Sequence, residues 1–141
     1  MTIAAILKDK GDIQSLAPDS TVAEAVALLA EKRIDAAPVL DGGRVVGIFS
    51  ERDVINCLQS DGAAALERRI GDVMTTAVKS IGPNESAIGA LSLMTQRRIR
   101  HLPVIEGDVL VGFVSIGALV KYRIARIEAD AAAMREYIQS A

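Results

Sequence analysis

The sequence contains no tryptophan, and its whole aromatic set is two phenylalanines and two tyrosines, 3% of its 141 residues. Proteins that bind single-stranded nucleic acids stack bases on aromatic side chains, so this scarcity argues against such a function. Half of the residues are nevertheless hydrophobic, and the core must therefore be built from alanine, valine, isoleucine and leucine. A chain of this length can bury such a core without disulfides or a metal.

Cysteine and histidine are each present once, as Cys57 and His101. Cys57 cannot form an internal disulfide, and a lone thiol is more often a small buried apolar group than a nucleophile. Neither a zinc site nor a set of nucleophile, base and orienting group can be assembled from these residues. The sequence therefore predicts a protein of a reducing compartment that has no metal and is not an enzyme.

Charge of one sign is also lacking, because 16 Lys and Arg stand against 18 Asp and Glu, a net charge of -2. This balance provides no overall attraction for DNA or RNA. The first apolar stretch is interrupted by charge at Lys8, too early for a secretion signal, and no segment approaches transmembrane length. We expect a cytoplasmic protein with neither nucleic-acid nor membrane partners.

The sequence repeats itself after 65 positions. Residues 18–55 align with residues 83–120 without a gap and with 11 identities in 38 positions. Two units of this kind, each too small to bury its own apolar face, should pack together as a pseudo-twofold pair. The identical pairs include Pro38 with Pro103, Gly47 with Gly112 and Ser50 with Ser115.

Each unit predicts the same series of elements. Thr21 with Glu24 three residues later is a capping box, which indicates a helix that ends near Arg33. A strand, a glycine-containing hairpin turn and a returning strand follow, and Ser50 can cap the next helix. The expected strands are 36–40, 44–49, 101–105 and 109–114; the expected helices are 22–33, 51–58, 86–98 and one from about 116; 63–69 is a connector with a short helix and 70–74 a lead-in to the second unit.

After the second unit, apolar residues alternate by four and three positions, a heptad spacing sustained over about two and a half heptads. Two interpretations are open. The stripe packs on its own domain as an ordinary amphipathic helix, or it packs against the same helix of a second chain. The residues of the stripe are Val120, Ile124, Ile127, Ala131, Met134 and Ile138.

Each copy thus combines a helix, a strand with Pro-Val, a hairpin, and a strand that enters a helix through Gly-x-x-Ser. This pattern resembles the CBS domain, and two copies resemble the tandem pair called a Bateman module, of the stand-alone bacterial type with a C-terminal helical tail. The resemblance implies an α/β (α+β) fold of two β-α-β-β-α repeats packed as a pseudo-twofold pair, plus a long C-terminal helix. The division it implies is 1–65, 66–123 and a tail at 124–141.

The resemblance also implies a function, which is regulation rather than catalysis. Such modules carry two clefts between the repeats, many bind AMP, ADP, ATP, NAD or S-adenosylmethionine, and they commonly form disc-shaped dimers. We therefore expect a non-enzymatic sensor of an adenine nucleotide, a homodimer through the repeats and the C-terminal helix, with an unidentified protein target. The expected ligand-binding residues are Ser50, Asp53, Arg52, Ala37, Pro38, Arg98, Arg100, His101 and Ser115.

The residues of the first copy are suited to this role. Ser50 stands where a strand becomes a helix, so its hydroxyl and the free backbone N–H groups there could hold a phosphate. Asp53, one turn later, could accept hydrogen bonds from both hydroxyls of a ribose. The alternative is that both residues only cap their helix, where negative charge is favourable without any ligand.

The second copy differs at the position of this acid, since Asp53 aligns with Ala118 and the second cleft should be degenerate. The second copy has basic residues where the first has none: Arg100 and His101 align with Asp35 and its neighbour. Asp35 would repel a phosphate. Similarity to the kinase-regulating AMP sensors implies one composite site, with the ribose on the first copy and the phosphate on the second. An adenine there must lie between aliphatic side chains, because no aromatic residue is shared by the copies.

Other interpretations remain open. The arginines can be the solvated end of a helix, and a histidine on an apolar strand is more often a satisfied core residue. Ala118 and Asp35 also fit a structural or interaction module that has lost ligand binding. An enzyme that uses Asp53 or Cys57 is a third, more distant alternative.

Overall fold

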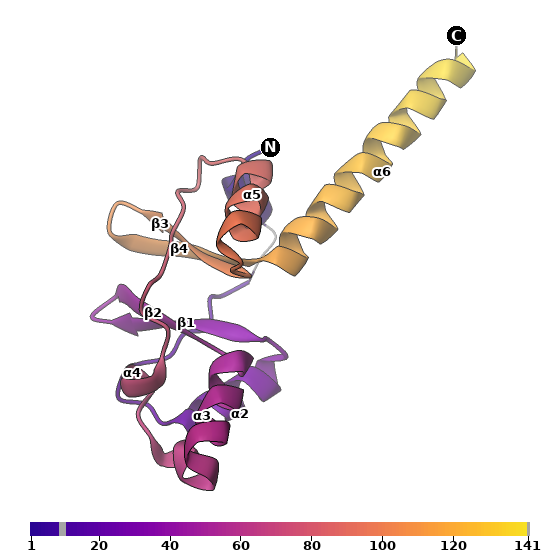
Figure 1. Ribbon diagram of the computed structural model, residues 1–141. Helices are drawn as coiled ribbons and strands as arrows, with labels where there is room; N and C mark the ends of the chain where they lie inside the picture. The colour runs from indigo at the N-terminus through magenta and orange to yellow at the C-terminus, as the bar shows by residue number, and fades with distance from the viewer. Residues whose placement is uncertain (9–10, 141) are drawn as a thin grey trace.

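In a computed structural model, which describes residues 1–8 and 11–140, the two sequence repeats form two units of the same build (Figure 1). Each unit has a helix, a two-stranded antiparallel hairpin and a second helix. The first contains α2 (Val22–Lys32), β1 (Ala36–Asp41), β2 (Arg44–Ser50) and α3 (Glu51–Asp61). The second contains α5 (Ala87–Arg97), β3 (His101–Glu106), β4 (Val109–Ser115) and α6 (Ile116–Ser140). Shorter elements are α1 (Ile3–Leu7), the 3-10 helix η1 (Gly62–Glu67) and α4 (Ile70–Val73).

The two hairpins have the same register. Ala36 pairs with Ser50 and, 65 positions later, His101 pairs with Ser115. The pairing shifts by one residue at the equivalent point of both hairpins. The expected β-α-β-β-α unit begins with a strand, but in the structure a single residue before each helix forms a bridge to the hairpin. This isolated bridge takes the place of the first strand. The expected mixed fold and its repeat are thus confirmed.

The helices begin as the capping patterns predict. Thr21 Oγ1 accepts a hydrogen bond from Glu24 N at 3.2 Å, and the Glu24 carboxylate accepts one from Thr21 N. α2 and α5 end one residue earlier than expected, because Arg33 and Arg98 adopt left-handed conformations with φ of 54° and 55°. The two arginines are equivalent in the repeat, so both units turn from helix to strand in the same way.

Each unit has its own hydrophobic core, and each core includes a short helix that lies next to the other unit in the sequence. α1 opens the chain, yet Ile3 and Ile6 lie in the core formed by α5, β3 and β4. α4 precedes the second unit, yet Ile70 lies in the core formed by α2, β1 and β2. The expected division at 1–65 and 66–123 therefore does not follow the cores, because packing exchanges these two helices between the units.

α6 begins on the second unit and then projects away from both units (Figure 1). Leu119 is fully buried and Tyr122 is partly buried against the second core. Beyond them the helix is exposed to its end at Ser140. The heptad stripe therefore does not pack on its own domain: the exposed fractions of its five large residues range from 43% at Val120 to 66% at Ile138. In residues 1–8 and 11–140, no helix combines the length and apolar character needed to cross a membrane.

Candidate functional site

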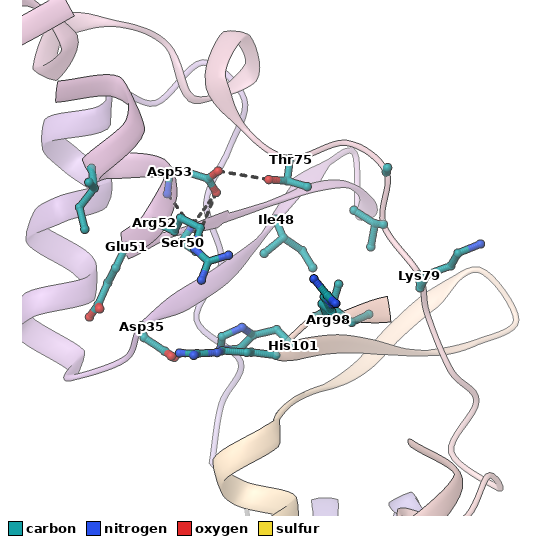
Figure 2. A pocket seen from close by; sticks show the side chains of 15 residues that line it. Asp35, Ile48, Ser50, Glu51, Arg52, Asp53, Thr75, Lys79, Arg98 and His101 are labelled. Carbon is teal, nitrogen blue, oxygen red and sulfur yellow. Dashed lines mark hydrogen bonds and ion pairs between the residues drawn. The ribbon is translucent and has the colours of Figure 1, made fainter. Parts of the chain in front are cut away.

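A cavity of about 520 Å³ lies between the two units and is lined by both (Figure 2). The first unit contributes the start of α3 and part of β2, and the second contributes the turn from α5 to β3. The connecting segment 75–79 completes the lining. Thr75 is held at the edge of β2, because its backbone N–H and C=O both bond to Ile48 at 2.9 Å.

Ser50 and Asp53 form a capping box at the start of α3. Asp53 Oδ2 accepts from Ser50 N at 2.9 Å and from Ser50 Oγ at 3.1 Å, while Asp53 N donates to Ser50 Oγ at 3.4 Å. The other carboxylate oxygen, Oδ1, accepts from Thr75 Oγ1 at 3.2 Å (Figure 2). The two interpretations of this pair are thus compatible, because a carboxylate has about four lone-pair positions and the Asp53 carboxylate can accept one more hydrogen bond from a ligand.

Positive charge enters the cavity from several elements. Arg98 and Arg100 come from the turn between α5 and β3, Lys79 from the connecting segment, and Arg52 from α3. All four are exposed residues. Exposed cations at the rim of a cavity can attract an anion and then lose part of their hydration when it binds.

His101 lies at the floor of this region, and its side chain is only 11% exposed. Its Nε2 is 2.8 Å from Oδ1 of Asp35, which belongs to the first unit (Figure 2). A carboxylate accepts hydrogen bonds, so Nε2 is the donor in this pair. The imidazole also stacks on Phe113 with ring centroids 5.5 Å apart. His101 is therefore fixed from two sides and joins the two units.

The structure brings six of the nine expected residues to this cavity: Ser50, Arg52, Asp53, Arg98, Arg100 and His101. The other three are not among its lining residues. Ala37 and Pro38 are buried in β1, and the Ser115 hydroxyl accepts from Ala118 N at 3.1 Å at the start of α6.

Part of the cavity lining could not be predicted from the sequence. The connecting segment lies outside the repeated residues, so the repeat gives no signal for Thr75 or Lys79. One wall of the cavity is apolar, and the sequence predicts it only in general terms, as aliphatic side chains around an adenine. Its members are Ile48, Ile55, Ala77, Val78 and Ile99.

A smaller cavity of about 340 Å³ is lined largely by residues that the repeat relates to those of the larger cavity. Its lining includes Ala36 and Gln14 where the first cavity has His101 and Lys79. Among the residues that the structure describes, the one charged residue in its lining is Asp12. Within the described ranges, no three His, Cys, Asp or Glu side chains gather in a way that could hold a metal ion.

Comparison with known proteins identifies the repeated unit. The family model of the CBS domain matches residues 6–60 and 70–125. The chain belongs to the CBS-domain family. As two such domains stand in series and account for most of the sequence, it is a tandem CBS module, as the resemblance implied.

Similar proteins have the same arrangement. A CBS-domain containing protein from Agrobacterium tumefaciens is 36% identical, with a TM-score of 0.82 over 86% of this chain and 92% of that chain. The CBS domain-containing protein YhcV of Bacillus subtilis is 30% identical over 120 residues, 85% of each protein. CBSX2, whose crystal structure is in complex with AMP, is 25% identical, with a TM-score of 0.74 over 88% of this chain and 96% of that chain.

Proposed function

We propose that this tandem CBS module is a non-enzymatic, cytoplasmic regulatory protein that binds an adenosine-containing ligand, AMP, ADP, ATP or NAD, in the larger cavity. One observation supports this most strongly: a carboxylate from the first repeat and cations from the second line one cavity. Its volume of about 520 Å³ is within the range of small-molecule sites. AMP in the CBSX2 complex is consistent with this ligand class.

Asp53 is the proposed ribose acceptor. It is already oriented by Ser50 and Thr75 on either side, so little side-chain entropy remains to be lost when a ribose binds. One ribose hydroxyl can donate to the remaining lone-pair position of Oδ1, and a second one would replace the hydroxyl of Ser50 or Thr75. The first repeat thereby selects a nucleoside rather than any anion.

The phosphate is proposed to lie toward the second repeat, near Arg98, Arg100 and His101, with Lys79 beside them. Guanidinium groups bind phosphate through paired hydrogen bonds. Asp35 lies on the same side and is bonded to His101. The phosphate must therefore bind on the side of the cavity that holds the Asp35 carboxylate, which reduces its affinity.

The adenine is proposed to lie against the aliphatic wall formed by Ile48, Ile55, Val78 and Ile99. The two faces of the adenine ring are apolar, and covering them with such a wall removes apolar surface from water. Because the ligand would contact both repeats, its binding free energy can favour one relative orientation of the units. We propose that this change is transmitted to a protein target and through a homodimer formed by the repeats and α6.

Ligand-dependent thermal unfolding tests this proposal. At least one of AMP, ADP, ATP and NAD should raise the Tm, and a ligand at 100 times its Kd stabilises by about 2.7 kcal/mol. Asp53→Ala should remove the rise because the ribose acceptor is lost. It should also lower the Tm without ligand, since a helix cap contributes about 1 kcal/mol.

Glu24→Ala is a matched control, because it opens the equivalent capping box of α2 far from the cavity. This variant should lose stability to a similar extent and keep the ligand-induced rise. No rise in the wild-type protein with any of the four ligands would contradict the proposal. The alternative, an interaction module without a ligand, would then be favoured.

A further inference from the structure

The exposed stripe of α6 is the largest unexplained apolar feature of the structure. Five of its six residues are large hydrophobic side chains, each between 43% and 66% exposed. α6 has 25 residues, and in proteins most of the stability of a helix comes from the packing of its apolar face rather than from helix propensity. The stripe has the spacing of a coiled-coil seam, with Ile124, Ala131 and Ile138 at a positions and Val120, Ile127 and Met134 at d positions.

The face of α6 that packs on its own unit is a different one. Apart from Ile116 at its start, the residues of α6 that are not exposed are Ala118, Leu119 and Tyr122, and they occupy b, c and f positions of the same heptad frame. These positions lie opposite the seam. The seam is therefore free along its whole length, and a second helix could lie on it without meeting the unit from which α6 starts.

The charges beside the seam indicate what this second helix is. In a parallel, in-register pair, each g residue faces the e residue five positions later on the other helix. Arg123 would then face Glu128 of a second copy, and Asp130 would face Arg135. Both contacts join opposite charges, and the symmetry of the pair makes each of them twice. Asp130 also has a partner in its own helix, Arg126, at 3.6 Å, so the contact of Arg123 with Glu128 is the better probe.

An antiparallel pair is disfavoured by the same charges. Full overlap of the seam would align Val120 with Ile138 of the second copy. Equivalent flanking positions would then meet, which places Glu128 against Glu128 and Lys121 against Arg135. Like charges at such positions weaken pairing.

We infer that α6 pairs in parallel and in register with α6 of a second copy of this chain. This inference rests on the homodimer of the proposed function and specifies its contacts. The two CBS modules lie at the same end of the paired helices, on opposite sides of the seam. A change in the orientation of the units could then alter the start of both helices together.

Sedimentation equilibrium of the full chain at low salt tests the charge contacts. Glu128→Arg replaces two attractions by two repulsions, and at a few tenths of a kcal/mol each the dimer Kd should rise about tenfold. Glu136→Arg makes the same charge change at an f position, away from the seam, and should leave the Kd within about twofold. Adding Arg123→Glu to Glu128→Arg should recover most of the lost affinity, because the opposite charges are restored in exchanged order.

Cysteine cross-linking tests the orientation. Ile138→Cys places a thiol at an a position near the end of the helix, where the parallel pair brings the two copies together. Oxidation should yield a disulfide dimer much faster than for Glu136→Cys, the control on the outer face. Cys57, which is buried, is present in both variants.

Three results would overturn the inference: a monomeric wild-type protein at millimolar concentration, equal effects of Glu128→Arg and Glu136→Arg, or equal rates of cross-linking at positions 136 and 138. Failure of the ligand proposal has a separate signature, because the Tm rise with nucleotide does not depend on α6 charges. Glu128→Arg should therefore retain that rise while its dimer weakens.

Discussion

Asp35 is the residue of the cavity whose replacement should strengthen ligand binding. It is an acid on the side where the phosphate is proposed to lie, and its Oδ1 is 2.8 Å from His101 Nε2. Asp35→Asn removes the negative charge and keeps an oxygen that can accept from His101. The substitution therefore changes the charge of the cavity while retaining the hydrogen bond between the units.

The expected size follows from Coulomb's law. Two unit charges about 6 Å apart repel by about 0.7 kcal/mol in water and about 3 kcal/mol at an effective dielectric constant of 20. The Asp35 side chain is 54% exposed, so the lower end of this range applies. Removing about 1 kcal/mol of repulsion should lower the Kd of a phosphorylated ligand about fivefold.

Isothermal titration calorimetry with AMP and with adenosine separates the charge effect from other effects. Asp35→Asn should strengthen the binding of AMP about fivefold at low salt and less at high salt, whereas adenosine, which has no phosphate, should bind as to the wild type. Asp41→Asn makes the same charge change at the last residue of β1, outside the cavity lining, and serves as the control. Unchanged or weaker AMP binding by Asp35→Asn, or an equal gain for adenosine, would refute the proposed position of the phosphate.

Two other predictions concern the first unit. In Gly47→Ala the new Cβ would lie 2.5 Å from Met74 Sδ and 2.9 Å from the carbonyl oxygen of Thr75, so the free energy of unfolding measured in urea should fall by about 1–3 kcal/mol. Gly82→Ala is the control, because the nearest atoms there are 4.0 Å away, and its free energy of unfolding should fall less. Equal losses in the two variants would contradict the close packing at Gly47. Burial raises the pKa of the Cys57 thiol above its ordinary value of 9.0, so at pH 9 iodoacetamide should modify the folded protein more slowly than the urea-unfolded protein; equal rates would show that the thiol is accessible and ionises normally.

Much of the fold could be predicted because it depends on local patterns. The capping boxes at Thr21 and Ser50 and the hairpin turns act within a few residues of the chain. A gapless repeat then requires both units to have the same build. The hairpins accordingly share one register and the same irregularity.

Other features depend on contacts that no local pattern encodes. Arg33 and Arg98 have left-handed conformations that usually favour glycine, so they could not be predicted from their residue type. The exchange of α1 and α4 between the cores depends on tertiary packing, and their sequences are compatible with either unit.

The candidate site was predicted in part for the same reason. Ser50, Asp53 and the basic residues of the second unit could be found because the repeat aligns them and shows where the copies differ. Thr75 lies outside the repeat and reaches Asp53 only because its backbone bonds to the edge of β2. Asp35 was expected to oppose a phosphate, but its bond to His101 across the units could not be foreseen from sequence.

A crystal structure of the full chain grown with AMP would test the central proposal most directly. We expect AMP in the larger cavity, with the ribose hydroxyls bonded to Asp53 and the phosphate facing Arg98 and Arg100. A well-ordered protein with this cavity empty at saturating AMP, or AMP bound only in the smaller cavity, would contradict it.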